Sequence, residues 1–133
     1  MNRITYSLAM LVVMAFLTPH AVAGSVVVDK NNVTKTYDCA GGAASINGNR
    51  NILTLSNCSQ VSVAGNYNQI TLSGDSPDLS VPGNDNHVVA GNVKKISTLG
   101  NKNIVTWTSP KEDEKPSILN PGTGNSISRL KEE

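Results

Sequence analysis

Short segments of alternating apolar and polar residues recur along the chain at a nearly constant interval. Each interval holds two segments, one before and one after a Gly-Asn-x-Asn motif. The segments before the motif are Ala44-Ser45-Ile46, Val61-Ser62-Val63, Leu79-Ser80-Val81, Ile96-Ser97-Thr98 and Ile118-Leu119-Asn120. Alternation with a period of two is typical of β-strands that bury one face. We therefore predict that the outer residues of each triplet point inward and the middle residue outward.

The segments after the motif align in the same way. One predicted inward column holds Leu53, Ile70, Val88, Val105 and Ile127, and the other holds Leu55, Leu72, Ala90 and Trp107. The column between them, Thr54, Thr71, Val89, Thr106 and Ser128, is then predicted to point outward. The next outward station, Ile52, Gln69, His87, Ile104 and Ser126, is irregular, which argues against the paired threonine ranks of an ice-binding face.

The repeated motif indicates the fold class. Its glycines, Gly48, Gly65, Gly83, Gly100 and Gly122, lie 17, 18, 17 and 22 residues apart. Self-similarity at such a period is the signature of a solenoid, in which each repeat is one coil. We predict an all-β protein: a short, single-stranded parallel β-helix (β-solenoid) of about four to five coils of 17–18 residues. The general rule for parallel crossovers favours a right-handed coil.

The motif itself is predicted to form structural corners between the two strands of a coil. Glycine, and secondarily asparagine, tolerates the positive φ angles of sharp turns. Stacked asparagines can also exchange amide hydrogen bonds in a ladder. The two predicted columns are Asn49, Asn66, Asn84 and Asn101, and Asn51, Asn68, Asn86, Asn103 and Asn125. A ligand or metal site made of these carboxamides is the alternative. Only the repeat with Asp85 approaches a calcium-binding nonapeptide, so calcium is not supported.

The rest of the chain divides around these repeats. Residues 1–23 are predicted to be a secretory signal peptide, with Arg3, an apolar run and the small-residue site Ala21-Val22-Ala23. Residues 24–43 are expected to form N-terminal strands and a cap. The repeats occupy 44–130, with a charged, proline-bracketed loop at 110–116, and 131–133 form a polar tail.

Composition and charge narrow the possible partners. After cleavage, 10 basic and 10 acidic residues remain, because Arg3 is the only charged residue of the leader. This balance gives no basic cluster for nucleic acid. The apolar run of the leader is too short to span a bilayer, and no transmembrane segment is expected after cleavage. The protein is therefore expected to be exported, to the periplasm or the medium.

Cys39 and Cys58 are expected to form a disulfide. Both occupy the same station relative to the following repeat glycine, once the extra residues at Gly41-Gly42 are looped out. Neighbouring strands lie about 4.8 Å apart, which is within the Cα separation that a disulfide accepts. An exported protein also reaches a compartment where disulfides persist. Two free buried thiols, or a metal or redox pair, are the alternatives.

The sequence does not assemble a catalytic site. His87 is the only histidine after the leader, and no serine or cysteine motif accompanies it. Asp75 and Asp78 share a turn and Asp85 lies at a corner, but nothing marks two of them as a glycosidase pair. Zinc-ligand spacing is absent. No catalytic, cofactor-binding or metal-binding residue is predicted, and the protein is not expected to be an enzyme.

Three stretches resemble a known family: Thr36-Tyr37-Asp38-Cys39-Ala40-Gly41-Gly42, Ile46-Asn47-Gly48-Asn49-Arg50-Asn51, and the segment from Asn57 to Asn68 with the second cysteine. They are similar to DUF3060, a family of small exported bacterial proteins of unknown function. The resemblance runs from Thr36 to about Val105. It implies a bacterial envelope or secreted protein with a short β-solenoid, and it carries over no catalytic residue. The extra Gly-Asn-x-Asn coils and the charged loop depart from the family pattern.

These observations favour an exported, non-enzymatic β-solenoid that binds a partner, protein or glycan, or serves a structural role in the bacterial envelope. A carbohydrate-active β-helix enzyme is one alternative, and it rests on fold analogy alone. A structural envelope protein that associates with itself is the other. The sequence leaves the oligomeric state open.

Overall fold

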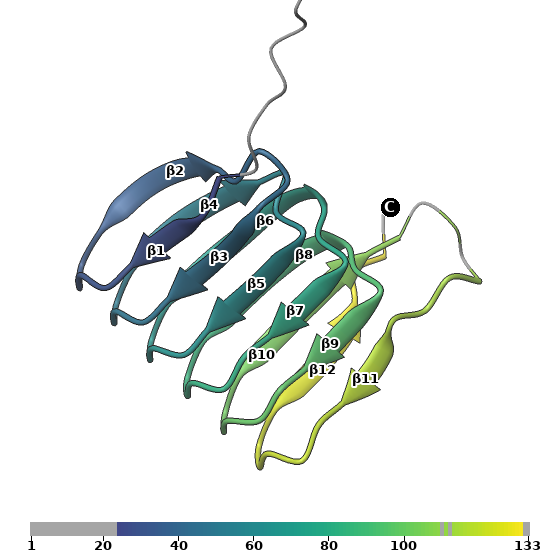
Figure 1. The fold of residues 1–133 in the computed structure, drawn as a ribbon. Coiled ribbons are helices and arrows are strands. Elements are labelled where there is room, and N and C mark those ends of the chain that lie inside the picture. Colours follow the sequence, from purple (N-terminus) through teal and green to yellow (C-terminus); the bar gives the residue numbers. More distant parts are fainter. Residues whose placement is uncertain (1–23, 110, 112, 132–133) are drawn as a thin grey trace, which may run out of the picture.

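The computed structural model describes residues 24–109, 111 and 113–131. The predicted signal peptide therefore lies outside the described residues. The described part is built from β-strands joined by short turns, without a helix (Figure 1). The strands are β1 (Val26–Val28), β2 (Thr34–Asp38), β3 (Ala43–Ile46), β4 (Ile52–Ser56), β5 (Gln60–Val63), β6 (Gln69–Asp75), β7 (Asp78–Ser80), β8 (His87–Asn92), β9 (Lys95–Ser97), β10 (Ile104–Thr108), β11 (Ser117–Leu119) and β12 (Ser126–Arg129).

The strands form two six-stranded sheets that face each other (Figure 1). The first sheet has the order β1-β3-β5-β7-β9-β11, and the second has the order β2-β4-β6-β8-β10-β12. Every neighbouring pair is parallel, for example β4 with β6. Each coil contributes one strand to each sheet, so the described residues make six coils. The predicted all-β parallel solenoid is confirmed, while its right-handed sense stays a prediction.

The count of four to five coils is close to the six observed. The additional coil is the first, made by β1 and β2 from the residues expected to form N-terminal strands. Val26 pairs with Ala44 and Thr34 with Ile52, each 18 residues further along the chain, so this segment is a full coil in register. Its corner, Lys30-Asn31-Asn32-Val33, lacks the glycine and the second asparagine of the motif.

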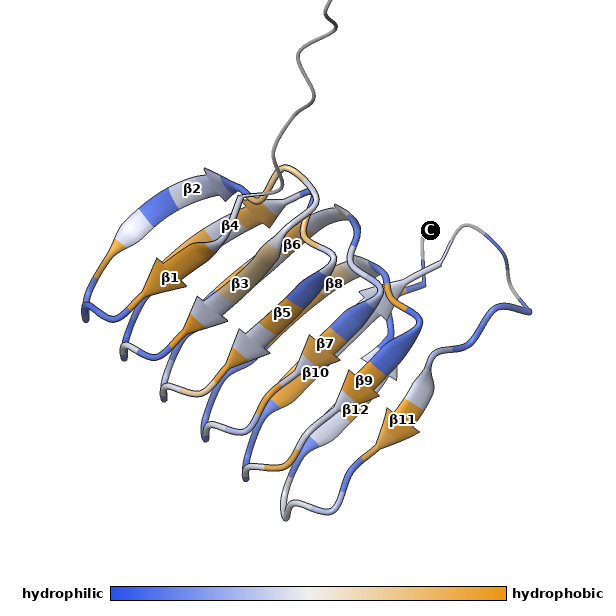
Figure 2. Ribbon diagram, viewed as in Figure 1, coloured by the Kyte–Doolittle hydropathy of each residue, from blue (hydrophilic) through white to orange (hydrophobic). Residues whose placement is uncertain are grey.

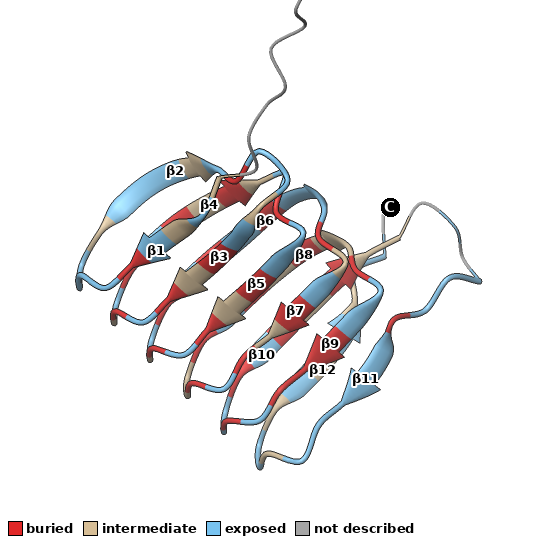
Figure 3. Cartoon of the chain, viewed as in Figure 1, coloured by how far each residue is buried: buried red, intermediate tan, exposed pale blue. Residues whose placement is uncertain are grey.

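The hydrophobic core lies between the two sheets, where the predicted inward columns meet. Leu53, Ile70, Val88 and Val105 pair in register across β4, β6, β8 and β10, and all are buried. Figure 2 shows the alternation of hydrophobic and hydrophilic positions along the strands, and Figure 3 shows the buried positions continuing from coil to coil. Because buried and more exposed residues alternate along the strands, these columns bury one face of each sheet and leave the other facing solvent.

The two ends of the solenoid carry cations at stations that are apolar in the interior coils. Lys35 pairs in register with the buried Leu53, and its ammonium nitrogen lies 4.9 Å from the centre of the Tyr37 ring. At the other end, Arg129 pairs with Trp107, and its guanidinium carbon lies 5.5 Å from the centre of that ring. Figure 3 shows that two of the four terminal strands, β2 and β11, are largely exposed.

The charged loop between β10 and β11 accounts for the longest interval between repeats. Of the predicted loop, Pro110 and Glu112 lie outside the described residues. Lys111 forms an exposed ion pair with Glu114 at 3.1 Å. The Nη2 atom of Arg129 donates to the Lys111 and Ser109 carbonyl oxygens at 3.2 Å, which ties the loop to the last coil. Of the predicted tail, residues 132–133 lie outside the described part.

Among the residues that the structure describes, no helix is long and apolar enough to cross a membrane.

Candidate functional site

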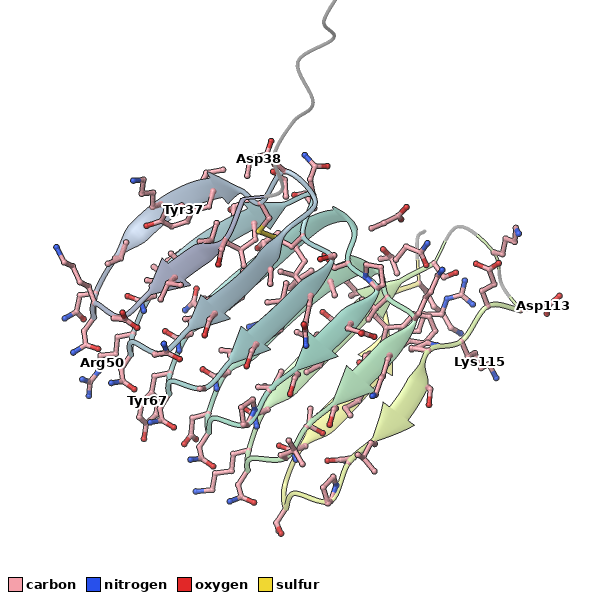
Figure 4. The ribbon with its side chains drawn as sticks, in the orientation of Figure 1. Tyr37, Asp38, Arg50, Tyr67, Asp113 and Lys115 are labelled. Atoms are coloured by element: carbon pink, nitrogen blue, oxygen red, sulfur yellow. A yellow bond between two sulfur atoms is a disulfide. The ribbon has the colours of Figure 1, made fainter. Side chains whose placement is uncertain are left out.

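The Gly-Asn-x-Asn motifs line up along one edge of the solenoid, where the chain passes from the first sheet to the second. We call this edge, residues 47–51, 64–68, 82–86, 99–103 and 121–125, the corner edge. Figure 4 shows two residues of this edge, Arg50 and Tyr67, projecting away from the sheets on neighbouring coils. The motif places three different kinds of side chain here, and each has a different role.

The glycines are required by close contact between coils. A Cβ atom on Gly65 would lie well inside the van der Waals distance of the Gly48 carbonyl oxygen. The same clash recurs at each repeat glycine, against the carbonyl oxygen of the corresponding residue one coil earlier. Positive φ angles occur instead at the variable x position, at Arg50 (55°), Tyr67 (59°), Asp85 (55°) and Lys102 (55°). The prediction that glycine supplies the positive φ is therefore wrong, because its role is to make room for the coil before it.

The second asparagines of the motif form a buried ladder. Asn51, Asn68, Asn86 and Asn103 are at most 1% exposed. The Oδ1 atom of Asn68 accepts a hydrogen bond from the backbone N–H of Asn51 at 2.9 Å. Its Nδ2 atom donates to the Gly48 carbonyl oxygen at 3.0 Å, in the same preceding coil. The pattern continues to Asn125, whose Oδ1 accepts from the Asn103 N–H at 2.8 Å.

The first asparagines of the motif form a second ladder that runs in the opposite sense. The Oδ1 atom of Asn49 accepts from the backbone N–H of Asn66 at 2.8 Å, in the following coil. Asn66 and Asn84 repeat the bond at 2.9 and 2.8 Å, and Asn101 accepts from the Thr123 N–H at 2.8 Å. The ladder begins one coil earlier, at Asn31, whose Oδ1 accepts from the Asn49 N–H at 2.6 Å. The carboxamides are thus occupied in holding coils together.

The x residues of the motif point outward, and their roles were not predicted from the sequence. We call Arg50, Tyr67, Asp85 and Lys102 the corner strip. The guanidinium carbon of Arg50 lies 5.6 Å from the centre of the Tyr67 ring, and Tyr67 is 57% exposed. The available signal was that x is the one station at which the four motifs from 48 to 103 differ. A station that varies within an otherwise fixed corner presents its side chains to solvent, while its backbone supplies the positive φ of the turn.

The outward face of the second sheet carries the predicted hydroxyl column. We call it the threonine face: Thr36, Thr54, Thr71, Val89, Thr106 and Ser128, paired in register from β2 to β12. The neighbouring outward column includes Ile52 and Ile104, which are 52% and 47% exposed. Gln69 and His87 separate these isoleucines, so the face is a mixed array of polar and apolar side chains, with one residue of each column per coil.

The predicted disulfide is confirmed on the edge opposite the corner edge. Cys39 and Cys58 are buried, and their Cα atoms are 4.9 Å apart on adjacent coils. Beside them, the Asp38 carboxylate accepts hydrogen bonds from the Ala40 N–H at 2.8 Å and from the Asn57 side chain at 3.1 Å. The bond from Ala40, and then that from Asn57, lowers the pKa of Asp38 below its usual value. Figure 4 shows the disulfide near Asp38.

The candidate carboxylates of the sequence lie at two different edges of the solenoid. Asp75 accepts a hydrogen bond from Asn92 at 3.1 Å at the end of β6, and Asp78 begins β7. Asp85 lies on the corner edge instead, and His87 on the face of the second sheet. No group of three or more His, Cys, Asp or Glu side chains in the described ranges is arranged to hold a metal ion.

An open cavity of about 380 Å³ lies where the charged loop passes the turn between β8 and β9. Lys94, Asp113, Glu114 and Lys115 contribute the charged part of its lining. Figure 4 shows Asp113 and Lys115 near the outer part of this loop. Glu114 is paired with Lys111, as described above. Asp113 and Glu114, the two acidic residues of the lining, are adjacent on the charged loop.

Residues 63–124 match the model of the DUF3060 family, which is described as a protein of unknown function. The resemblance to this family is confirmed over these residues, which include the motifs at Gly65, Gly83, Gly100 and Gly122. The match begins after both cysteines and extends beyond Val105, so the region of similarity is the repeats. No curated protein and no solved structure matches the chain.

Proposed function

We propose that the protein is an exported, non-enzymatic binding module of the bacterial envelope, and that the threonine face holds an extended partner. The observation that carries the proposal is the in-register outward column from Thr36 to Ser128, flanked by the half-exposed Ile52 and Ile104. The exposed Thr71 hydroxyl and the isoleucines of the neighbouring column offer both hydrogen bonds and apolar contact, whereas the Thr106 Oγ1 atom is buried. Such a repeating surface fits a partner that is itself extended, a glycan chain or a protein strand.

Export is supported by the disulfide as well as by the leader predicted from the sequence. Cys39 and Cys58 are both used in one bond, and such bonds persist in oxidising compartments. The rigid coil also suits a binding role. Because the Oδ1 atoms of the corner asparagines accept hydrogen bonds from neighbouring coils, the outward side chains sit on a fixed backbone. A surface that is already ordered loses little conformational entropy when it binds.

A site-specific crosslinking experiment tests the threonine face. A photo-reactive amino acid that replaces Thr71 lies on the threonine face. One that replaces Ser62 lies in the same coil but on the outward face of the first sheet. We expect irradiation of cells that export the protein to give a discrete crosslinked product from position 71 and none from position 62. Equal products from both positions, or none from position 71, would contradict the threonine face as the binding surface.

The non-enzymatic part of the proposal has its own test. The purified protein is incubated with envelope polysaccharides, and newly formed reducing ends are measured. We expect no release above the buffer control. Time-dependent release that disappears when Asp75 and Asp78 are both changed to Asn would replace the binding module with a carbohydrate-active enzyme.

A further inference from the structure

The corner strip holds long side chains in a backbone conformation that is unfavourable for them. The left-handed region costs an L-residue other than glycine about 1–2 kcal/mol, and asparagine and aspartate tolerate it best. The first and last coils follow this preference, with Asn32 at φ 57° and Gly124 at φ 72°. Arg50, Tyr67 and Lys102 do not, although each adopts the same turn. The fold alone gives no reason for these three side chains.

Arg50 and Tyr67 form a preorganised pair on neighbouring coils. The guanidinium carbon lies 5.6 Å from the ring centre, within the range of a cation–π contact. More than half of the Tyr67 surface is still open to solvent. An exposed aromatic ring held in place by a cation is a suitable platform for the C–H face of a sugar ring, while the phenolic hydroxyl stays available for hydrogen bonds.

The order of charges along the strip selects among ligands. Arg50 and Lys102 are cations at two separated coils, and the carboxylate of Asp85 lies between them in the sequence of coils. With about 4.8 Å between coils, the strip extends over about 14 Å. Asp85 would repel an anionic chain that has no hydroxyl groups to donate, such as a polyacidic peptide. A carboxylate beside a hydroxyl-rich ligand instead accepts hydrogen bonds, and the two cations bind acid groups on either side.

We propose that the corner strip is a binding site for a linear acidic polysaccharide, one that carries carboxylates and free hydroxyls on its sugar rings. Tyr67 stacks on a ring, Arg50 and Lys102 bind carboxylates, and Asp85 accepts from hydroxyl groups. The asparagines behind the strip take no part, because their amides are bonded between coils. The corner strip is separate from the threonine face. It is a second binding surface of the module proposed above, and the proposal names the class of ligand that it binds. Either surface can therefore fail while the other stands.

Binding to polygalacturonate oligosaccharides tests the proposal, with their methyl esters as the uncharged form of the same sugar. Calorimetry on the full exported chain is expected to give weaker binding of the esters. Tyr67→Asn and Arg50→Asn should each weaken polygalacturonate binding about tenfold, which corresponds to the energy of one aromatic or cation–π contact. Asparagine is chosen because it tolerates the left-handed turn, so melting temperatures should not fall.

Ser62→Asn, on the outward face of the first sheet in the same coil, is the matched control and should leave polygalacturonate binding unchanged. The proposal is overturned if the wild-type chain does not bind polygalacturonate, or if the esters bind equally well. It is also overturned if Tyr67→Asn binds like wild type, or if polyglutamate binds as tightly as polygalacturonate, which would make the strip a peptide site. It is overturned as well if Thr71→Asn loses polygalacturonate binding while Tyr67→Asn does not, which would place the glycan on the threonine face.

Discussion

At the scale of single residues, the Gly-Asn-x-Asn motif separates three requirements that one turn has to meet. The glycine leaves room for the carbonyl oxygen of the coil before it, and the x residue supplies the positive φ. The two asparagines occupy the backbone donors that the turn would leave free. Each requirement is met at its own position, so single substitutions at this corner should have distinct effects.

Asn68 and Thr71 lie on the same coil but face opposite environments. Asn68→Ala removes the acceptor of the Asn51 N–H and the donor to Gly48. Because these groups are buried, we expect a loss of about 1–3 kcal/mol in the free energy of unfolding. Thr71→Ala changes an exposed side chain and should cost about 0.5 kcal/mol or less. Thermal and denaturant unfolding of both variants measures the difference, and equal small losses would contradict the buried ladder.

Substitutions at Gly65 and Gly41 distinguish the cost of a steric clash from the cost of a positive φ angle. At Gly65 a methyl group meets the Gly48 carbonyl oxygen, so Gly65→Ala must push two coils apart. We expect a loss of about 3 kcal/mol, the upper part of the range for overpacking. At Gly41 the φ angle is 84° and nothing lies within 4 Å of the added methyl, so Gly41→Ala should cost about 1 kcal/mol. A larger loss at Gly41 than at Gly65 in urea unfolding would contradict this account.

Asp38 should make stability depend on acid pH. Its folded pKa is lowered by the hydrogen bonds from Ala40 and Asn57. The ionised form therefore stabilises the fold above the unfolded pKa near 3.8, and this contribution is lost as the pH falls through the lower folded pKa. The difference in melting temperature between wild type and Asp38→Asn should shrink between about pH 5 and pH 2. A difference that stays constant over this interval would exclude Asp38 as its source.

At the scale of elements, the period-two pattern was enough to place most strands and their inward faces. Leu53, Ile70 and Val88 were assigned to the core because each lies between outward residues, and all three are buried. The first coil was harder to recognise because Lys30 and Val33 stand where later coils have glycine and asparagine. The corner strip was missed for another reason. A sequence pattern marks what repeats, while φ angles and side-chain stacking depend on the folded turn.

The disulfide joins the first two coils at the edge where β2 and β3 are linked. The cysteines are 19 residues apart in sequence, and the chain-entropy relation gives about 3 kcal/mol for a loop of this size. We expect the double variant Cys39→Ser, Cys58→Ser to lose about that amount in the free energy of unfolding, while the secondary structure is retained. Mass spectrometry should find that neither wild-type thiol reacts with an alkylating reagent before reduction. Alkylation of both would contradict the bond.

At the scale of the whole molecule, the two ends resist the addition of another coil. If a second copy stacked in register on β12, Lys35 would meet Ile127 and Arg129 would meet Tyr37, as the strand pairings place them. The Lys35 ammonium would enter the apolar interior against Ile127, and burying a charge is costly unless it is paired. Inward-pointing charges are a known means of blunting exposed strand edges. The self-associating structural protein considered from the sequence is thus disfavoured at its most direct interface.

Replacing both cations should open this interface. We expect Lys35→Val combined with Arg129→Leu to convert the protein into end-to-end assemblies, seen by light scattering and electron microscopy. The control variant, Lys94→Leu with Lys95→Leu, removes the same charge from exposed positions away from the ends. If both double variants stay the same size as wild type, the end cations do not control stacking. If both assemble, net charge and not its position is responsible.

The opposite sense of the two asparagine ladders has a consequence for how such proteins change over generations. The Oδ1 atom of Asn68 bonds to the coil before it, and the Oδ1 atom of Asn66 bonds to the coil after it. Each interior coil therefore presents the same set of hydrogen-bonding groups to the coil on either side. Duplication of one 17-residue unit within the gene would then insert a coil that fits without any compensating substitution. Only the outermost coils, with Lys35 and Arg129, would have to stay where they are. The length of the molecule can therefore change during evolution by one whole coil at a time, while the two end coils stay the same.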